Sequence, residues 1–156
     1  VIRSTFLVGF PSEKRRDFET LLHFVEAARP DWMGTFAYST EEGTPAYGCR
    51  PWKHRLPLLK NFSSAVAENR KRTLERRGTE IMTANLDRFV GNRYQVLVEE
   101  RIQGEDMVLA RAYFQAPEVD TLIVVHDDGS LSAGDTPFCT ITKRNGIDLE
   151  GQFEPE

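Results

Sequence analysis

The stretch Val1-Ile2-Arg3-Ser4-Thr5-Phe6-Leu7-Val8-Gly9-Phe10-Pro11 begins the chain and decides the fold of its first third. Its β-branched and aromatic residues are typical of a strand, and a turn follows at Gly9. Residues 18–28 then place apolar side chains at helical spacing, with Ser12 available as the helix N-cap. Pro30 ends that helix, and residues 34–39 resemble a second strand. This order predicts a βαβ unit with two parallel strands.

Two parallel strands bury too little apolar surface to be stable alone, so the unit implies neighbouring strands in a larger parallel sheet. The chain also begins inside a predicted strand, without an initiator methionine or a signal-peptide pattern. We therefore expect it to be a piece of a longer protein.

The middle of the chain is basic. Residues 47–58 lack periodicity, and residues 59–89 are predicted to be helical, with Gly78 weakening or bending the helix. Residues 50–90 contain 10 basic and 4 acidic side chains. Such a run is most often a solvated helix face, and contact with RNA or a ribosome is the alternative.

Beyond Gly91, apolar residues alternate with polar ones, which is the pattern of β-strands. The Asn145-Gly146 pair is a strong signal for a two-residue hairpin turn. Five short strands leave edges that closure would remove, so we expect a small five-stranded antiparallel barrel of the OB type. The predicted strands are residues 94–101, 107–114, 121–126, 136–143 and 147–153.

Charge divides the chain into two parts. The whole sequence has 20 basic and 24 acidic residues. Residues 1–90 contain 15 basic and 11 acidic residues, whereas residues 91–156 contain 5 basic and 13 acidic residues. An acidic barrel repels a phosphate backbone and favours a basic protein partner, unless its acids only keep it soluble. The acids we expect to contact a partner lie in predicted turns: Glu105, Asp106, Asp127 and Asp128. No apolar run is long enough to span a bilayer, so no membrane association is expected.

No active site is complete by spacing alone. Cys49 and Cys139 are too few for a disulfide framework or a zinc site, and they suit a reducing compartment. Cys139 alternates with apolar residues and is predicted to be a buried, unreactive core residue. The three histidines lack metal-ligand spacing, and there is no glycine-rich phosphate loop.

Several segments resemble the methylthiotransferase family of radical S-adenosylmethionine enzymes. The end of its radical barrel is similar to residues 2–11, Leu21-Leu22, Phe24-Val25-Glu26, Phe36-Ala37-Tyr38-Ser39 and Glu41-Glu42-Gly43-Thr44-Pro45-Ala46. The last two of these segments resemble the RimO-type branch, which modifies an aspartate of a small-subunit ribosomal protein. Residues 112–125, which contain Ala116-Pro117-Glu118-Val119-Asp120, likewise resemble the RimO-type TRAM domain. The tRNA-modifying branch typically has a basic residue and a proline where Glu41-Glu42 stands.

This resemblance implies an α/β plus all-β chain. Residues 1–48 would be the βαβ end of a partial, TIM-like radical SAM barrel, residues 49–90 a basic helical connector, and residues 91–156 a TRAM domain that recognises the protein substrate. The whole enzyme would be cytoplasmic and would use S-adenosylmethionine and two 4Fe–4S clusters. The chain has no CxxxCxxC motif, so by itself it is expected to bind no cluster and to be inactive.

The resemblance also assigns candidate cofactor residues. Val8, Gly9 and Phe10 match the strand end that borders the adenosyl moiety in the family, and Tyr38 and Ser39 close the next strand at the same edge. The alternative is structural, with Gly9 serving the turn and Phe10 the core. Two other functions stay open: a tRNA methylthiotransferase fragment, and a non-catalytic RNA-binding or adaptor module. Salt-dependent RNA binding would favour these two.

Overall fold

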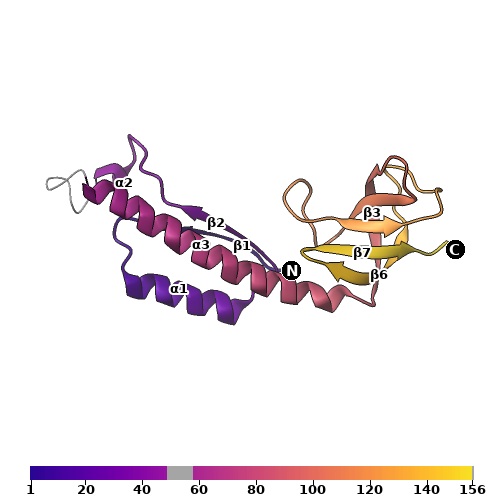
Figure 1. Cartoon of the computed structure of the whole chain (residues 1–156), viewed down its shortest axis with the longest axis horizontal. Coiled ribbons are helices and arrows are strands. Elements are labelled where there is room, and N and C mark those ends of the chain that lie inside the picture. The colour runs from indigo at the N-terminus through magenta and orange to yellow at the C-terminus, as the bar shows by residue number, and fades with distance from the viewer. Residues whose placement is uncertain (49–57, 156) are drawn as a thin grey trace. The chain divides into compact units, whose positions relative to one another are not determined.

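The computed structural model describes residues 1–48 and 58–155, which form two units, Val1–Met82 and Thr83–Glu156 (Figure 1). The first unit contains β1 (Arg3–Val8), α1 (Arg15–Ala28), β2 (Trp32–Ala37), the short α2 (Pro45–Gly48) and most of α3 (Leu58–Leu86). The second unit contains η1 (Asp87–Phe89), β3 (Arg93–Arg101), β4 (Met107–Ala112), β5 (Ile123–His126), β6 (Phe138–Asn145) and β7 (Asp148–Phe153).

The first unit has the predicted βαβ order. β1 and β2 pair in parallel, from Arg3 opposite Trp32 to Val8 opposite Ala37, which confirms the prediction for these strands. α1 and α3 run along this strand pair (Figure 1). The core contains buried side chains from β1, α1 and α3, namely Val8, Val25, Leu74 and Ile81.

The first helix begins later than the sequence suggested. Lys14, and not Ser12, is the N-cap, and its backbone N–H donates to the Asp17 carboxylate over 2.8 Å. The Asp17 side chain thus satisfies one of the free donors at the helix start, which explains why the serine is not needed there. The helix ends at Arg29 in the left-handed conformation, just before Pro30.

α3 is one continuous helix through Gly78. A Cβ at Gly78 would lie 1.9 Å from the Met33 Cε, so the glycine makes room for a side chain of β2. Leu74 and Ile81 of this helix belong to the core of the first unit. Much of the segment predicted as a connector therefore packs against the βαβ unit.

The second unit is a closed barrel in the order β3-β4-β5-β7-β6. Its closure by five strands confirms the prediction, but the prediction of an all-antiparallel barrel is wrong, because β5 and β7 are parallel from Ile123 opposite Leu149 to His126 opposite Gln152. A closed ring with an odd number of strands cannot alternate direction all the way round, so one parallel pair is unavoidable. The interior is filled by alternate residues of the strands, including Val96, Val98, Val108, Ala110, Val125 and Ile141.

The predicted hairpin at Asn145-Gly146 is present. Asn145 pairs with Asp148 across the turn, and Gly146 has a φ of 66°. No described helix combines the length and the apolarity that crossing a membrane would require.

Candidate functional site

The carboxyl ends of β1 and β2 bring the predicted cofactor residues together. Val8 is buried at the end of β1, and its carbonyl accepts a hydrogen bond from the Tyr38 backbone over 2.8 Å. The rings of Phe10 and Tyr38 meet edge to face with their centroids 5.3 Å apart. Ser39 follows, and its hydroxyl donates to the Glu41 carboxylate. In parallel α/β structures ligands bind at this edge of the sheet.

A carboxylate holds the turn after β1 in place. One oxygen of Glu13, Oε2, accepts hydrogen bonds from the backbone N–H groups of Gly9 (2.6 Å) and Phe10 (3.3 Å). The other, Oε1, accepts one from Arg70 Nη1 of α3 at 2.7 Å, and both side chains are only 14% exposed. This pair could not be predicted from the sequence, because Arg70 lies in a basic run that resembles a solvated helix face.

Gly9 is also required by packing. Its φ is +82°, and a Cβ there would lie 2.2 Å from the Cβ and 2.8 Å from the Cα of Ala67. The turn after β1 is therefore seated directly on α3, and only glycine fits at this point.

A buried tyrosine hydroxyl at this edge has no hydrogen-bond partner within residues 1–48 and 58–155. The Tyr38 hydroxyl is buried and makes no hydrogen bond within the described residues. Buried polar atoms in proteins nearly always have a partner, which is often a water molecule or a ligand. The edge thus combines aromatic surface with an unused hydroxyl.

The described residues do not fit an iron–sulfur cluster. Residues 1–48 and 58–155 contain no group of three His, Cys, Asp or Glu side chains that could hold a metal ion. Cys139 is buried as predicted, and burial raises the pKa of its thiol to about 11, so the thiolate that a cluster needs is disfavoured. Cys49 and His54 lie outside the described residues.

Three of the four predicted partner-contacting acids are exposed. Glu105 and Asp106 lie in the turn between β3 and β4, and Asp128 follows β5. The pKa of Asp128 is lowered because the hydroxyl and backbone N–H of Ser130 donate to its carboxylate.

Asp127 is the exception, since its side chain is 0% exposed. Its Oδ2 accepts hydrogen bonds from Arg101 Nη2 (2.7 Å) and from the backbone N–H of Leu131 (3.0 Å). The expectation that Asp127 presents its carboxylate to a partner does not agree with this burial. Asp127 and Arg101 instead fix the segment after β5.

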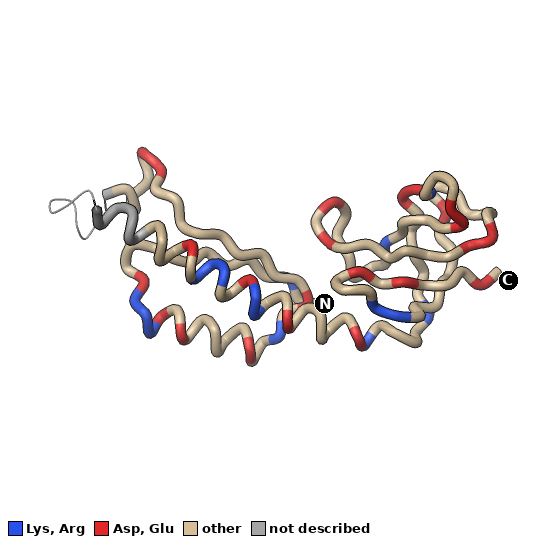
Figure 2. The backbone as a smooth tube through the Cα atoms, viewed as in Figure 1, with Lys and Arg blue, Asp and Glu red and all other residues tan. Residues whose placement is uncertain are grey.

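Most cations of the second unit are neutralised by acids of the same unit. The pairs are Arg93 with Glu154, Arg101 with Asp127, Arg111 with Glu99, Lys143 with Glu150, and Arg144 with Asp87. Residues 83–156 contain 6 basic and 14 acidic residues, so a large acidic excess remains. Figure 2 shows acids on the barrel's turns, whereas many basic residues of the first unit lie on α1 and α3. The exposed barrel acids without an ion pair among the described residues are Glu100, Glu105, Asp106, Glu118, Asp128, Asp135 and Asp148.

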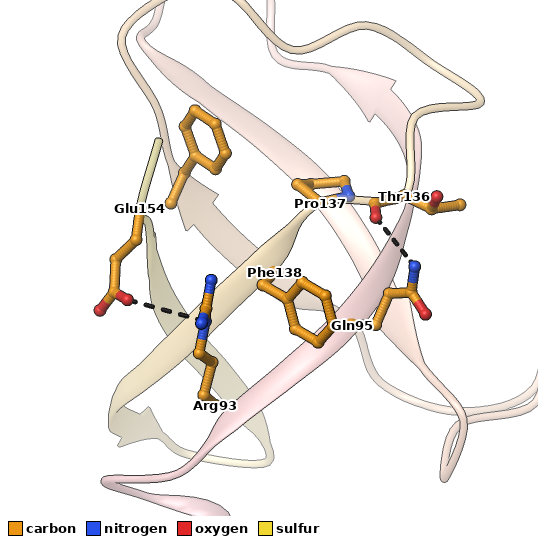
Figure 3. Close-up of a pocket in the computed structure, with 7 residues that line it drawn as sticks. Arg93, Gln95, Thr136, Pro137, Phe138 and Glu154 are labelled. Atoms are coloured by element: carbon orange, nitrogen blue, oxygen red, sulfur yellow. Dashed lines mark hydrogen bonds and ion pairs between the residues drawn. The ribbon is translucent and has the colours of Figure 1, made fainter. Parts of the chain in front are cut away.

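A shallow pocket of about 310 Å³ lies on the barrel surface over β3, the start of β6 and the end of β7 (Figure 3). Arg93 lies between Glu154 and the ring of Phe138, with its guanidinium carbon 4.8 Å from the ring centroid. Gln95 closes one side by donating to the carbonyl of Thr136 over 3.2 Å. This pocket could not be predicted from the sequence, because its residues come from separate strands that only the barrel's pairing brings together.

Residues 90–153 match the TRAM domain family. Relatives named "Ribosomal protein uS12 methylthiotransferase RimO" align with nearly all of the chain. The protein from Treponema denticola is 41% identical over 96% of this chain and 32% of its own length, and the one from Aquifex aeolicus is 37% identical over 97% and 33%. The protein from Thermus thermophilus is 37% identical over 96% and 32%. The chain thus spans about a third of the length of these relatives, and the resemblance to RimO-type methylthiotransferases is confirmed.

Proposed function

We propose that this chain is the C-terminal part of a RimO-type radical SAM methylthiotransferase. In this proposal residues 1–48 end the radical SAM barrel, residues 49–90 join it to the next domain, and residues 91–156 recognise the substrate. The parallel β1–β2 pair and the TRAM match over residues 90–153 support this division. The whole enzyme would act in the cytoplasm on an aspartate of the ribosomal protein uS12, the protein that the relatives' names specify.

The cofactor edge would be the carboxyl end of β1 and β2. In the whole enzyme S-adenosylmethionine and two 4Fe–4S clusters would supply the radical and sulfur chemistry. Val8, Gly9, Phe10, Tyr38 and Ser39 would border the adenosyl group, and the unused Tyr38 hydroxyl and the Phe10 ring suit it. Glu13 and Arg70 would keep this edge in shape. The chain has two cysteines and no CxxxCxxC motif, so the clusters would be held elsewhere in the whole enzyme and the chain by itself should be inactive.

The charge of the barrel is the observation that carries the substrate proposal. Five of its cations are paired internally, and most of its exposed acids without an ion pair among the described residues lie in turns and loops. A surface of this kind attracts a lysine- and arginine-rich protein and repels a bare phosphate backbone. Glu105, Asp106 and Asp128 are the acids that would meet the ribosomal protein.

The proposal is tested in cells that lack the gene encoding this chain. Intact-mass and peptide mass spectrometry of uS12 should show the loss of one methylthio group from an aspartate, while methylthiolated tRNA nucleosides stay at wild-type levels. Loss of the group from tRNA with uS12 unchanged would instead establish the tRNA-modifying function.

The pocket in Figure 3 is the observation that favours this second candidate, an RNA-directed enzyme or module. Phe138 is exposed, and Arg93 lies against its ring, an arrangement on which a nucleobase can stack. Glu154 beside Arg93 reduces the attraction for phosphate, so the acidic surface makes the protein substrate the better-supported reading.

A further inference from the structure

The loop between β4 and β5, residues 113–120, displays two apolar side chains to solvent. Tyr113 is 79% exposed and Val119 is 74% exposed, which makes them the most exposed large hydrophobic residues of the described chain. Glu118, beside Val119, is also exposed and has no ion pair among the described residues. An aromatic ring, an aliphatic side chain and a carboxylate therefore project from one short loop.

Buried and half-buried polar groups hold this 113–120 loop rigid. Gln115 is buried, its Oε1 accepts from the Ala112 backbone over 3.0 Å, and its Nε2 donates to the Thr121 carbonyl over 2.7 Å. Within the loop, the Asp120 carboxylate accepts from the Ala116 backbone over 2.6 Å. A loop closed twice in this way loses little conformational entropy when a partner binds.

The loop also has features that a simple connection would not need. Glu118 has a φ of 61°, a left-handed conformation that residues other than glycine seldom adopt and that is often found at functional sites. The Tyr113 ring rests against Tyr94 and Phe114, and Phe114 stacks on Phe89 with the centroids 3.9 Å apart. The exposed tyrosine thus stands on a packed aromatic base, as rigid aromatic anchors of interfaces do.

We infer that the 113–120 loop is the docking element for a lysine- or arginine-rich segment of the protein substrate. The inference rests on the proposed function and adds the surface that binds. Lysine and arginine carry apolar stems and cationic heads, so the stems can lie along Tyr113 and Val119 while a head pairs with Glu118. The acidic excess of the unit draws such a segment in and opposes RNA at the same surface.

The test measures the affinity of the full chain for purified uS12. Two matched double variants each replace one exposed aliphatic residue by serine and the adjacent acid by asparagine. The loop variant is Glu118→Asn with Val119→Ser, in which asparagine tolerates the left-handed backbone. The control is Ile147→Ser with Asp148→Asn, at the exposed turn between β6 and β7. We expect the loop variant, and Tyr113→Ser separately, to weaken binding at least tenfold, and the control to stay within twofold of wild type.

If the loop variant binds uS12 as tightly as wild type, the inference is overturned while the proposed substrate stands. The same holds if the loop variant and the control lose affinity equally. Absence of uS12 binding by the wild-type chain would contradict the proposed substrate recognition and the inference with it. Single-stranded RNA binding that depends on Tyr113 would show that the loop serves the other class of partner. A photo-crosslinking amino acid at position 113 should capture uS12 and one at position 147 should not, which tests the same claim without altering the loop's charge.

Discussion

The ion pair between Glu13 and Arg70 joins the turn after β1 to α3, and both side chains are largely removed from water. Replacing Arg70 by alanine would leave the Glu13 carboxylate without its cation in a site with little solvent. We expect Arg70→Ala to lower the free energy of unfolding by about 2 kcal/mol, measured by urea denaturation. Arg15→Ala removes an exposed i,i+4 pair with Glu19 and should change stability by less than about 0.5 kcal/mol. Equal effects of the two substitutions would contradict the structural role of Arg70.

The burial of Cys139 predicts how the stability of the folded chain depends on pH. Its ordinary pKa of 9.0 is raised to about 11 in the folded barrel, chiefly by burial. The unfolded chain therefore loses this proton at lower pH than the folded chain, so the contribution of Cys139 to stability is complete below pH 9 and is lost as the pH rises to 11. A shift of this size corresponds to about 2–3 kcal/mol. In a Cys49→Ser background, chemical denaturation measures the free energy of unfolding between about pH 9 and pH 11. Cys139→Ala should remove the part of its decrease that comes from this thiol, and an unchanged pH profile would contradict the burial of the thiol.

The contact between the turn after β1 and α3 affects stability separately from the backbone conformation of the glycine in that turn, and the two effects can be measured apart. Gly9 and Gly43 have nearly the same φ, +82° and +81°, but only Gly9 faces another residue, Ala67. Gly43→Ala should cost about 1 kcal/mol from its backbone conformation alone. Gly9→Ala should cost about 2 kcal/mol more because of the overlap with α3, as overpacking does elsewhere.

Adding Ala67→Gly to Gly9→Ala should restore part of the extra loss in unfolding free energy, because it removes the side chain that the new methyl group overlaps. The same addition to Gly43→Ala should restore no stability. Urea denaturation of these four variants and of Ala67→Gly alone gives the coupling between positions 9 and 67. Simple additivity at these two positions would show that the turn is not seated on the helix.

The elements themselves were largely predictable, because their signals are local. Alternating apolar residues marked the barrel strands, Asn145-Gly146 marked the hairpin, and Pro30 marked the end of α1. What could not be predicted depends on pairing between distant segments. The parallel β5–β7 pair follows from closing five strands, and the burial of Asp127 follows from the position of Arg101 on a different strand. The Glu13–Arg70 pair spans 57 positions, so no spacing rule could reveal it.

At the scale of the whole molecule, charge is divided between the two units. Residues 1–82 contain 14 basic and 10 acidic residues, and residues 83–156 contain 6 and 14. Neutralising Glu105 and Asp106 to Gln and Asn should slow association with uS12 several-fold at low salt, because exposed charges at turns steer a basic partner. The difference should shrink as salt rises past about 0.15 M. Stopped-flow or surface-binding kinetics measure it, with Glu41→Gln and Glu42→Gln of the first unit as the control.

An unchanged association rate in the Glu105 and Asp106 variant would show that these acids only keep the barrel soluble. The variant should remain as stable as wild type, because exposed turn substitutions usually change the free energy of unfolding by no more than about 0.5 kcal/mol.

The acidic barrel is proposed to recognise a basic ribosomal protein and not RNA. The most direct measurement titrates the full chain with uS12 and, in parallel, with tRNA over a series of salt concentrations. We expect saturable binding to uS12, with an association rate that falls as salt rises, and binding to tRNA that is weaker at every salt concentration. Tighter binding to tRNA than to uS12, with the steep salt dependence of phosphate contacts, would contradict it.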